Sequence, residues 1–306
     1  MRITNALQTH DTIAQLMTNS ARLAEAQERV STGLKVKTIS DDPTAGAGIM
    51  EASSALRGIE QFRKNVQGLG AQLDAEDGAL SQVGDVLTRA KELAVSQSGA
   101  NADIQTRAAA AAEVKELITQ VVQIGNTKLG DAFLFGGTNS TNAPPFDIAQ
   151  VSQTPTYVAI PAGQMAPQLP LGSRSVEISA AQTMPGVHDG NAVFVQTGVL
   201  TSLQALYDGL TTNSPTAIQA SETNLDNAMG SVQALVGDVG ARRNQIDAAG
   251  ASLDVLETSL KGTKSNLSEV DMEQAITEMV ARQTAYQAAM MASSKVMGMS
   301  LVDYLR

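Results

Sequence analysis

Histidines and carboxylates are the first residues to consider for chemistry, because imidazole and carboxylate groups ligate metals and transfer protons. His10 and His188 lie far apart in the chain, and neither has an Asp or Glu at the spacing of a metal motif. Each is therefore expected to be solvent-facing or structural. The neighbouring carboxylates of Asp41 and Asp42 could form an acid/base pair. An aspartate directly before Pro43 is better explained as the N-cap of a helix.

Other short patterns fail on their spacing. The acidic residues Asp74, Glu76 and Asp77 lack the glycine offset of a calcium loop, and we interpret them as a solvated helix face. Gly46-Ala47-Gly48 lacks the third glycine of a dinucleotide loop, and Gly262-Thr263-Lys264 lacks the upstream glycine of a phosphate loop. No Ser, Thr or Lys has a recognisable base beside it. We therefore predict no enzyme activity, no catalytic residue, no metal site and no cofactor.

Composition narrows the class of protein. The 306 residues include 31 acidic and 21 basic side chains, a formal net charge of −10. Without clustered Lys and Arg, a nucleic-acid partner is not expected. Five Phe, four Tyr and no Trp favour closely packed helices over sandwiches or barrels. The absence of Cys excludes disulfides and thiolate sites. Neither a secretory signal nor an apolar run of 18 residues is found, so we expect neither Sec export nor membrane insertion.

Two long segments carry the seven-residue apolar repeat of coiled coils. In the first segment Glu76 is the one charged residue among twelve seam positions: Ala55, Ile59, Phe62, Val66, Leu69, Leu73, Glu76, Leu80, Val83, Leu87, Ala90 and Ala94. In the second, a repeat without exception is formed by Ile218, Leu225, Val232, Val239, Ile246, Leu253 and Leu260, and Arg242 is the one interruption among the supporting positions Ala228, Leu235, Ala249 and Leu256. These repeats predict long helices in a bundle. Shorter helices are expected over residues 102–128 and 199–210.

Each end of the chain carries a narrower apolar seam. The N-terminal seam is formed by Ile13, Leu16, Leu23, Val30 and Leu34, and the C-terminal seam by Ile276, Met279, Tyr286, Met290, Met297 and Leu301. Burying about six such residues yields on the order of 15 kcal/mol, which is less than the cost of ordering some 35 residues at about 1–2 kcal/mol each. We therefore interpret these eleven residues as an assembly interface that becomes ordered against the other arm or a neighbouring subunit.

The middle of the chain differs in composition. Eight of the nine prolines lie between residues 144 and 215, and short β-like runs occur at residues 156–160, 175–178 and 192–195. The predicted fold class is mainly α with a small β-rich insertion. The expected domains are paired terminal helices (1–42 and 263–306), a helical bundle (43–136 and 199–262) and a β-rich outer domain (137–198).

Two terminal segments resemble those of the bacterial flagellin family, which includes flagellins and hook-filament junction proteins. The segment 31–49, STGLKVKTISDDPTAGAGI, resembles the turn after the first helix, and residues 266–306 resemble the C-terminal helix. The run 131–146, DAFLFGGTNSTNAPPF, is similar to the junction proteins, as are the segment 239–244, VGARRN, and the ending 300–305, SLVDYL.

The resemblance implies a structural protein that leaves the cell through the flagellar type III export apparatus and is found extracellularly, at the hook-filament junction of the flagellum. The partners it implies are further copies in a ring, another hook-associated protein on the hook side, flagellin on the filament side and an export chaperone. Two alternatives stay open. A flagellin filament subunit would share the terminal segments, and a cytoplasmic coiled-coil scaffold would explain the heptads alone.

Overall fold

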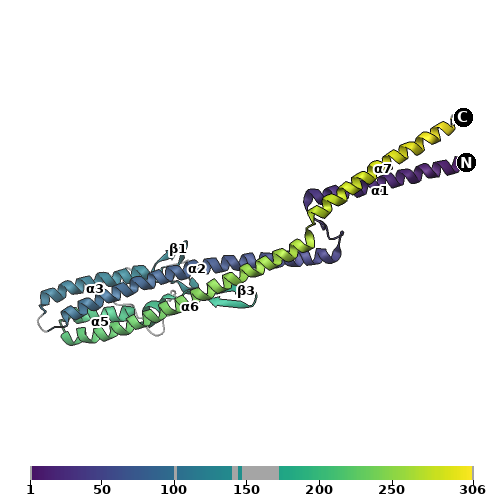
Figure 1. Ribbon diagram of the computed structural model, residues 1–306. Coiled ribbons are helices and arrows are strands. Elements are labelled where there is room, and N and C mark those ends of the chain that lie inside the picture. Colours follow the sequence, from purple (N-terminus) through teal and green to yellow (C-terminus); the bar gives the residue numbers. More distant parts are fainter. Residues whose placement is uncertain (1, 100–101, 140–143, 147–171, 305–306) are drawn as a thin grey trace. The chain divides into compact units, whose positions relative to one another are not determined.

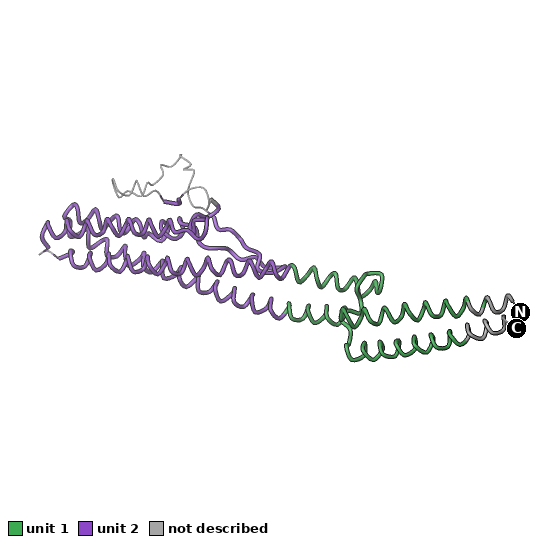
Figure 2. The backbone as a smooth tube through the Cα atoms, turned by 90° about the horizontal axis from the view of Figure 1, so that it is seen from above, with its two compact units in different colours: residues 1–57, 256–306 green, residues 58–255 purple. Residues whose placement is uncertain are grey.

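The computed structural model describes residues 2–99, 102–139, 144–146 and 172–304. Its elements form two compact units, which Figure 2 colours separately. Unit 1 contains residues 1–57 and 256–306, and unit 2 contains residues 58–255. Both units are mainly helical, as the sequence predicts. The division into three domains is not tested by these two units and stays a prediction.

Unit 1 contains the two terminal helices, α1 (Arg2–Thr32) and α7 (Met272–Tyr304), which lie side by side with the chain ends together (Figure 1). Gly33 follows α1 with a φ of +68°, a left-handed conformation that ends a helix readily without a Cβ. Asp42 caps the next helix, because its Oδ1 accepts bonds of 3.0 Å from the amides of Thr44 and Ala45. The predicted N-cap at Asp42 is therefore confirmed.

Unit 2 is a bundle built from α2 (Pro43–Gln97), α3 (Ile104–Gly125), α5 (Val199–Thr211) and α6 (Pro215–Ser268), of which α2 and α6 continue into unit 1. Both heptad seams form its core. The fully buried side chains include Leu69, Leu73, Leu80, Leu87, Leu203, Leu206, Leu210 and Ile218. The α6 residues from Ile218 to Leu253 that the seven-residue repeat singled out are all buried, so the repeat located the core of this helix.

Short elements lie between α3 and α5. Strand β1 (Lys128–Leu129) pairs antiparallel with β2 (Ala132–Phe133), and β3 (Ser175–Ser179) pairs antiparallel with β4 (Gln182–Pro185). A 3-10 turn, η1, covers Gly137–Asn139. The predicted strand at 175–178 is confirmed, whereas the β-like run 156–160 lies outside the described residues.

The third β-like run was predicted wrongly. Residues 192–195, predicted as a strand, lie in a π-helix, η2 (Asn191–Gln196). The Asp189 carboxylate accepts a 2.7 Å bond from the amide of Ala192 and so starts a helical turn, while the buried side chains of Val193 and Phe194 face the core.

An aromatic cluster joins the short elements to the bundle. The rings of Phe135 and Phe146 pack edge-on against Phe194, with centroid distances of 5.1 and 5.2 Å. Asn126 holds the backbone of Phe146 from both sides: its Oδ1 accepts from the Phe146 amide (2.9 Å) and its Nδ2 donates to the Phe146 carbonyl (2.8 Å). The end of the run 131–146 is thereby part of the packed core of unit 2.

Candidate assembly surface

The terminal helices run antiparallel, because the end of α1 lies beside the start of α7. Arg29 on α1 lies 3.8 Å from the carboxylate of Glu278 on α7. The connections at the same end are also paired. The amide of Val270 donates to the carbonyl of Gly33 (2.9 Å), and the amide of Lys35 donates to the carbonyl of Ser268 (2.8 Å). These bonds align the two arms.

The contact face between the arms is narrow. Its buried members are small, namely Ala26 on α1 and Ala275 and Ser293 on α7. The larger predicted seam residues on this face are only half-buried: Leu16, Leu23, Val30, Leu34, Met279 and Tyr286. Small residues let two helix backbones approach closely, but they leave little apolar area to stabilise a pair.

A second apolar face remains exposed. Met272, Ile276 and Val280 follow at four-residue steps along α7, and Met290 lies about five turns after Met272, so all four lie on one side of the helix. Met290 is 50% exposed and its neighbour Met291 68% exposed. We call Met272, Ile276, Val280, Met290 and Met291 the α7 stripe. On α1, Ile13 and Met17 are also exposed, Met17 to 69%.

The structure therefore divides the predicted interface residues into two groups. Six lie half-buried in the contact between the arms, whereas Ile13, Ile276 and Met290 are exposed. Met297 and Leu301 lie in α7, but their side chains are outside the described part of the chain. Sequence reasoning missed Met17, Met272, Val280 and Met291. The four-residue spacing of 272, 276 and 280 was the available signal.

A polar groove of about 600 Å³ lies between the last turns of α1 and residues 34–42. Within it, Lys37 forms a salt bridge with Glu28. The hydrogen bond to Glu28 is the main cause that raises the pKa of Lys37 above its ordinary value of 10.5. The Asp41 carboxylate accepts bonds from the amides of Thr38 (2.8 Å) and Lys37 (3.0 Å). These backbone bonds lower the pKa of Asp41 below its ordinary value of 3.8.

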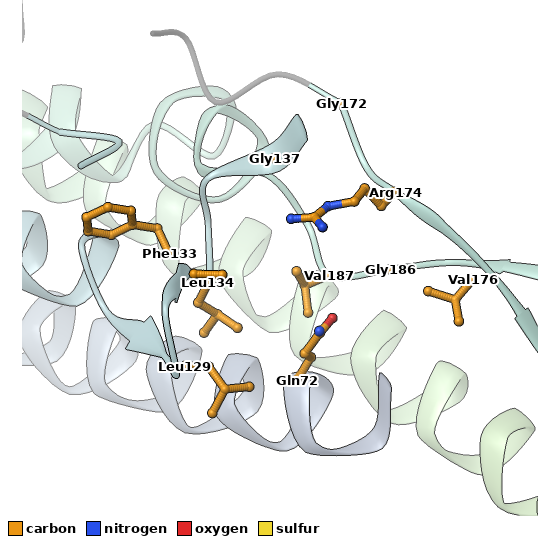
Figure 3. Close-up of a pocket in the computed structure, with 11 residues that line it drawn as sticks. Gln72, Leu129, Phe133, Leu134, Gly137, Gly172, Arg174, Val176, Gly186 and Val187 are labelled. Carbon is orange, nitrogen blue, oxygen red and sulfur yellow. The ribbon is translucent and has the colours of Figure 1, made fainter. Parts of the chain in front are cut away.

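Unit 2 contains a smaller cavity of about 120 Å³. Figure 3 shows its lining, in which Leu129, Phe133 and Leu134 lie near β1 and β2 while Arg174 and Val187 come from the other side. Among the described residues, no cluster of three His, Asp or Glu side chains could hold a metal ion. Within the same residues, no helix is both long and apolar enough to cross a membrane.

The fold is that of a mainly helical protein with an exposed apolar face on α7. Two family models match it: the bacterial flagellin N-terminal helical region over residues 3–140 and the bacterial flagellin C-terminal helical region over residues 223–305. The chain belongs to the bacterial flagellin family, whose members are structural proteins of the flagellum.

Similar proteins with curated names fall in two groups. The flagellar hook-associated protein 3 of Salmonella typhimurium is 24% identical and that of Escherichia coli 23% identical, and the alignments cover 98–100% of this chain and of each relative. The flagellin of Bacillus subtilis is 23% identical, with 100% of both chains covered. Overall identity alone therefore does not separate the two groups.

Solved structures share the fold. A putative flagellar hook-associated protein from Vibrio parahaemolyticus superposes with a TM-score of 0.64 at 18% identity, covering 75% of this chain and all of that one. The flagellar junction protein FlgL from Legionella pneumophila gives a TM-score of 0.53 at 16% identity, covering 72% of this chain and all of that one.

Proposed function

We propose that this chain is a structural subunit of the bacterial flagellum that joins the hook to the filament. The end-to-end alignment with two proteins named flagellar hook-associated protein 3 carries the proposal. The run 131–146, which resembles the junction proteins, supports it. This run ends at Phe146, a buried side chain of the aromatic cluster. A flagellin filament subunit is the alternative, favoured by the equally complete alignment with the Bacillus subtilis flagellin.

The proposed partners are further copies of this chain in a ring, another hook-associated protein on the hook side and flagellin on the filament side. An export chaperone accompanies the chain before export, and the assembled protein is extracellular. The α7 stripe supports contacts between subunits, because an exposed apolar face on a long helix is stabilised by burial against a neighbouring helix. No nucleic acid, membrane or cofactor takes part in this role.

Immunogold labelling of whole cells tests the proposal against its alternative. A junction protein gives one band of label at the hook-proximal end of each filament. Label along the whole filament would make the chain a flagellin, and label confined to the cytoplasm would make it a scaffold. Labelling an otherwise identical strain that lacks the protein controls for antibody specificity.

The terminal arms should become ordered on assembly, since their mutual contact is narrow and half-exposed. In the free monomer, amides of α1 and α7 are expected to exchange much faster than those of the buried seams of α2 and α6. Hydrogen exchange measured on a dilute monomer checks this expectation. Strong protection of both arms in a verified monomer would contradict it.

The outer part of the insertion should be dispensable for the junction, because surface-facing modules tolerate replacement. Two matched variants separate the outer module from the core. Replacing residues 147–171 with a short Gly/Ser linker retains Phe146 and the β3–β4 hairpin, whose Ile178 and Met184 are buried, and should preserve export and filament growth. Replacing residues 144–185 also removes this hairpin and the contact of Phe146 with Phe194 and should lower the melting temperature. Loss of filaments in the first variant, with normal export and melting, would show that the module makes essential contacts.

A further inference from the structure

The two heptad seams of the bundle each contain one charged residue, and in the structure these two residues lie at the same position along the bundle axis. Glu76 lies on the α2 seam and is 0% exposed, so its interpretation as part of a solvated helix face was wrong. Arg242 interrupts the seam of α6 and is half-buried. His188, from the segment after β4, lies between them and contacts both.

A hydrogen-bonded network connects the three side chains. Glu76 Oε1 accepts bonds from the His188 amide (3.1 Å) and from His188 Nδ1 (2.6 Å). His188 Nε2 lies 3.0 Å from Arg242 Nη2 and 3.1 Å from Asp238 Oδ2. Arg242 Nη2 also lies 2.7 Å from Asp238 Oδ2, and Arg242 Nη1 donates to the Gly186 carbonyl (2.6 Å).

This network contributes less to the stability of the core than apolar packing would. Glu76 Oε2 is buried with no hydrogen-bond partner, and an apolar side chain of similar volume at such a site is often neutral or more stabilising than a buried charge. Stability therefore does not explain the network well. Selection between alternative packings of the same helices is the best attested role of such buried polar groups.

The bundle has an alternative packing to select against. Both seams repeat similar aliphatic residues every seven positions, so sliding α2 past α6 by one heptad, about 10.5 Å, again places aliphatic residues opposite one another. Short connections align α2 with α3 (residues 98–103) and α5 with α6 (residues 212–214). No short connection aligns α2 with α6.

At one end of the bundle the buried Arg107 of α3 bonds both the Gln97 carbonyl at the end of α2 and the Asn213 side chain just before α6. Along the rest of the two helices, other polar contacts between α2 and α6 discriminate weakly. Arg63 pairs with Asp254, and Lys91 pairs with Asp226 at 2.5 Å, which is consistent with antiparallel helices in one register. All four side chains are at least 39% exposed. Exposed ion pairs of this kind contribute little free energy, because water and salt screen them. After a slip their groups would be solvated again.

We propose that Glu76, His188 and Arg242 form a polar key that sets the axial register between α2 and α6 and attaches the end of the insertion at that level. In a bundle slipped by one heptad, Glu76 would face aliphatic residues and lose its partner His188, whereas Arg242 would keep Asp238 on its own helix. A buried charge without a partner is strongly unfavourable. The key thus favours the observed register, in which the buried Glu76 keeps its bonds to His188.

Disulfide cross-linking tests this proposal, because the chain contains no Cys of its own. A Cβ at position 250 would lie 3.8 Å from Val66 Cγ1, so Val66→Cys with Gly250→Cys reports the observed register. Val66→Cys with Arg243→Cys, or with Glu257→Cys, reports a slip by one heptad in either direction. In the observed register these second pairs are about 10 Å too far along α6 for a disulfide.

The key is removed by the triple variant Glu76→Leu, His188→Leu, Arg242→Leu. With the key intact, we expect cross-linking of the 66/250 pair and at least tenfold less of either slipped pair. In the triple variant at least one slipped pair should cross-link in comparable yield, while helix content is retained. The control Arg63→Gln with Asp254→Asn removes an exposed ion pair between the same helices and should leave the yields unchanged.

Two results would overturn the proposal. The first is a triple variant that folds cooperatively and still cross-links only through the 66/250 pair, since another feature would then set the register. The second is loss of helix content both in the triple variant and in the milder Glu76→Gln with Arg242→Met, since the network would then supply stability. If only the triple variant fails to fold, the milder variant is assayed in its place, with the same expected slipped cross-links.

Discussion

The substitution Met290→Asp separates assembly from monomer stability. Half of the Met290 side chain is already packed within unit 1, since it is 50% exposed. Full burial of a methionine contributes about 1.5–3 kcal/mol, so the monomer should lose about 1 kcal/mol. If a neighbouring subunit covers the other half, assembly loses a further ~1 kcal/mol. Assembly of the variant would also bury a carboxylate, which costs several kcal/mol.

The matched control is Ala292→Asp, which introduces the same charge at an exposed position of α7 on the side away from the stripe. Both variants should give monomer melting curves close to wild type, measured by circular dichroism at 222 nm. In a strain that lacks its own copy, Met290→Asp should leave few filaments and release flagellin into the medium. Ala292→Asp should restore filaments.

Either of two outcomes would refute this prediction for Met290. A fall in monomer stability of more than about 3 kcal/mol, measured by urea unfolding, would mean that Met290 belongs to the core of unit 1. Normal filament number with Met290→Asp would mean that no subunit covers the α7 stripe at this position. Repeating the assay with Ile276→Asp, which is 46% exposed on the same stripe, extends the test along the helix.

Three further substitutions test other parts of the molecule. The buried guanidinium of Arg107 bonds the Gln97 and Gly99 carbonyls and the Asn213 side chain. Arg107→Met should therefore lower the free energy of unfolding of unit 2 by about 3 kcal/mol, measured by urea unfolding. A loss under about 1 kcal/mol would contradict this. Gly125→Ala should cost about 1–2 kcal/mol despite its better helix propensity, since the added Cβ would lie 2.7 Å from the Phe146 ring; Phe146→Ala, which makes room for that Cβ, should abolish the penalty. The lowered pKa of Asp41 predicts that its turn is stabilised above pH 3.8 and loses this stabilisation as the pH falls through the folded-state value. An NMR titration of the carboxyl would refute this with a midpoint at or above 3.8, and Asp41→Asn should remove the pH dependence.

Local signals in the sequence predicted most helices correctly. The strict repeat from Ile218 to Leu253 identified residues that are all buried, because a seven-residue period keeps one side of a helix facing its neighbours. Asp42 before Pro43 predicted the start of α2, since capping depends on a few adjacent residues. The family resemblance, carried by the terminal segments, was likewise readable from contiguous residues.

Predictions failed where a residue's environment comes from distant parts of the chain. Residues 192–195 have the composition of a strand, but Phe194 packs against Phe135 and Phe146 in a helical turn. Glu76 was interpreted as part of a solvated helix face, but it is buried and bonds His188 from a distant segment. Propensity is a weak indicator, and tertiary contacts override it in such places.

The sequence by itself determined which residues are apolar and at what period, and hence the helices, their buried faces and the family. Only the tertiary structure decided how the terminal seams divide between the contact of α1 with α7 and the exposed α7 stripe. It also decided that Glu76 and Arg242, two separate interruptions in the sequence, share one network through His188. Periodicity specifies the face on which a side chain lies, because it depends on helix geometry alone. The partner of that side chain depends on which distant segments pack beside it, and no local pattern encodes this.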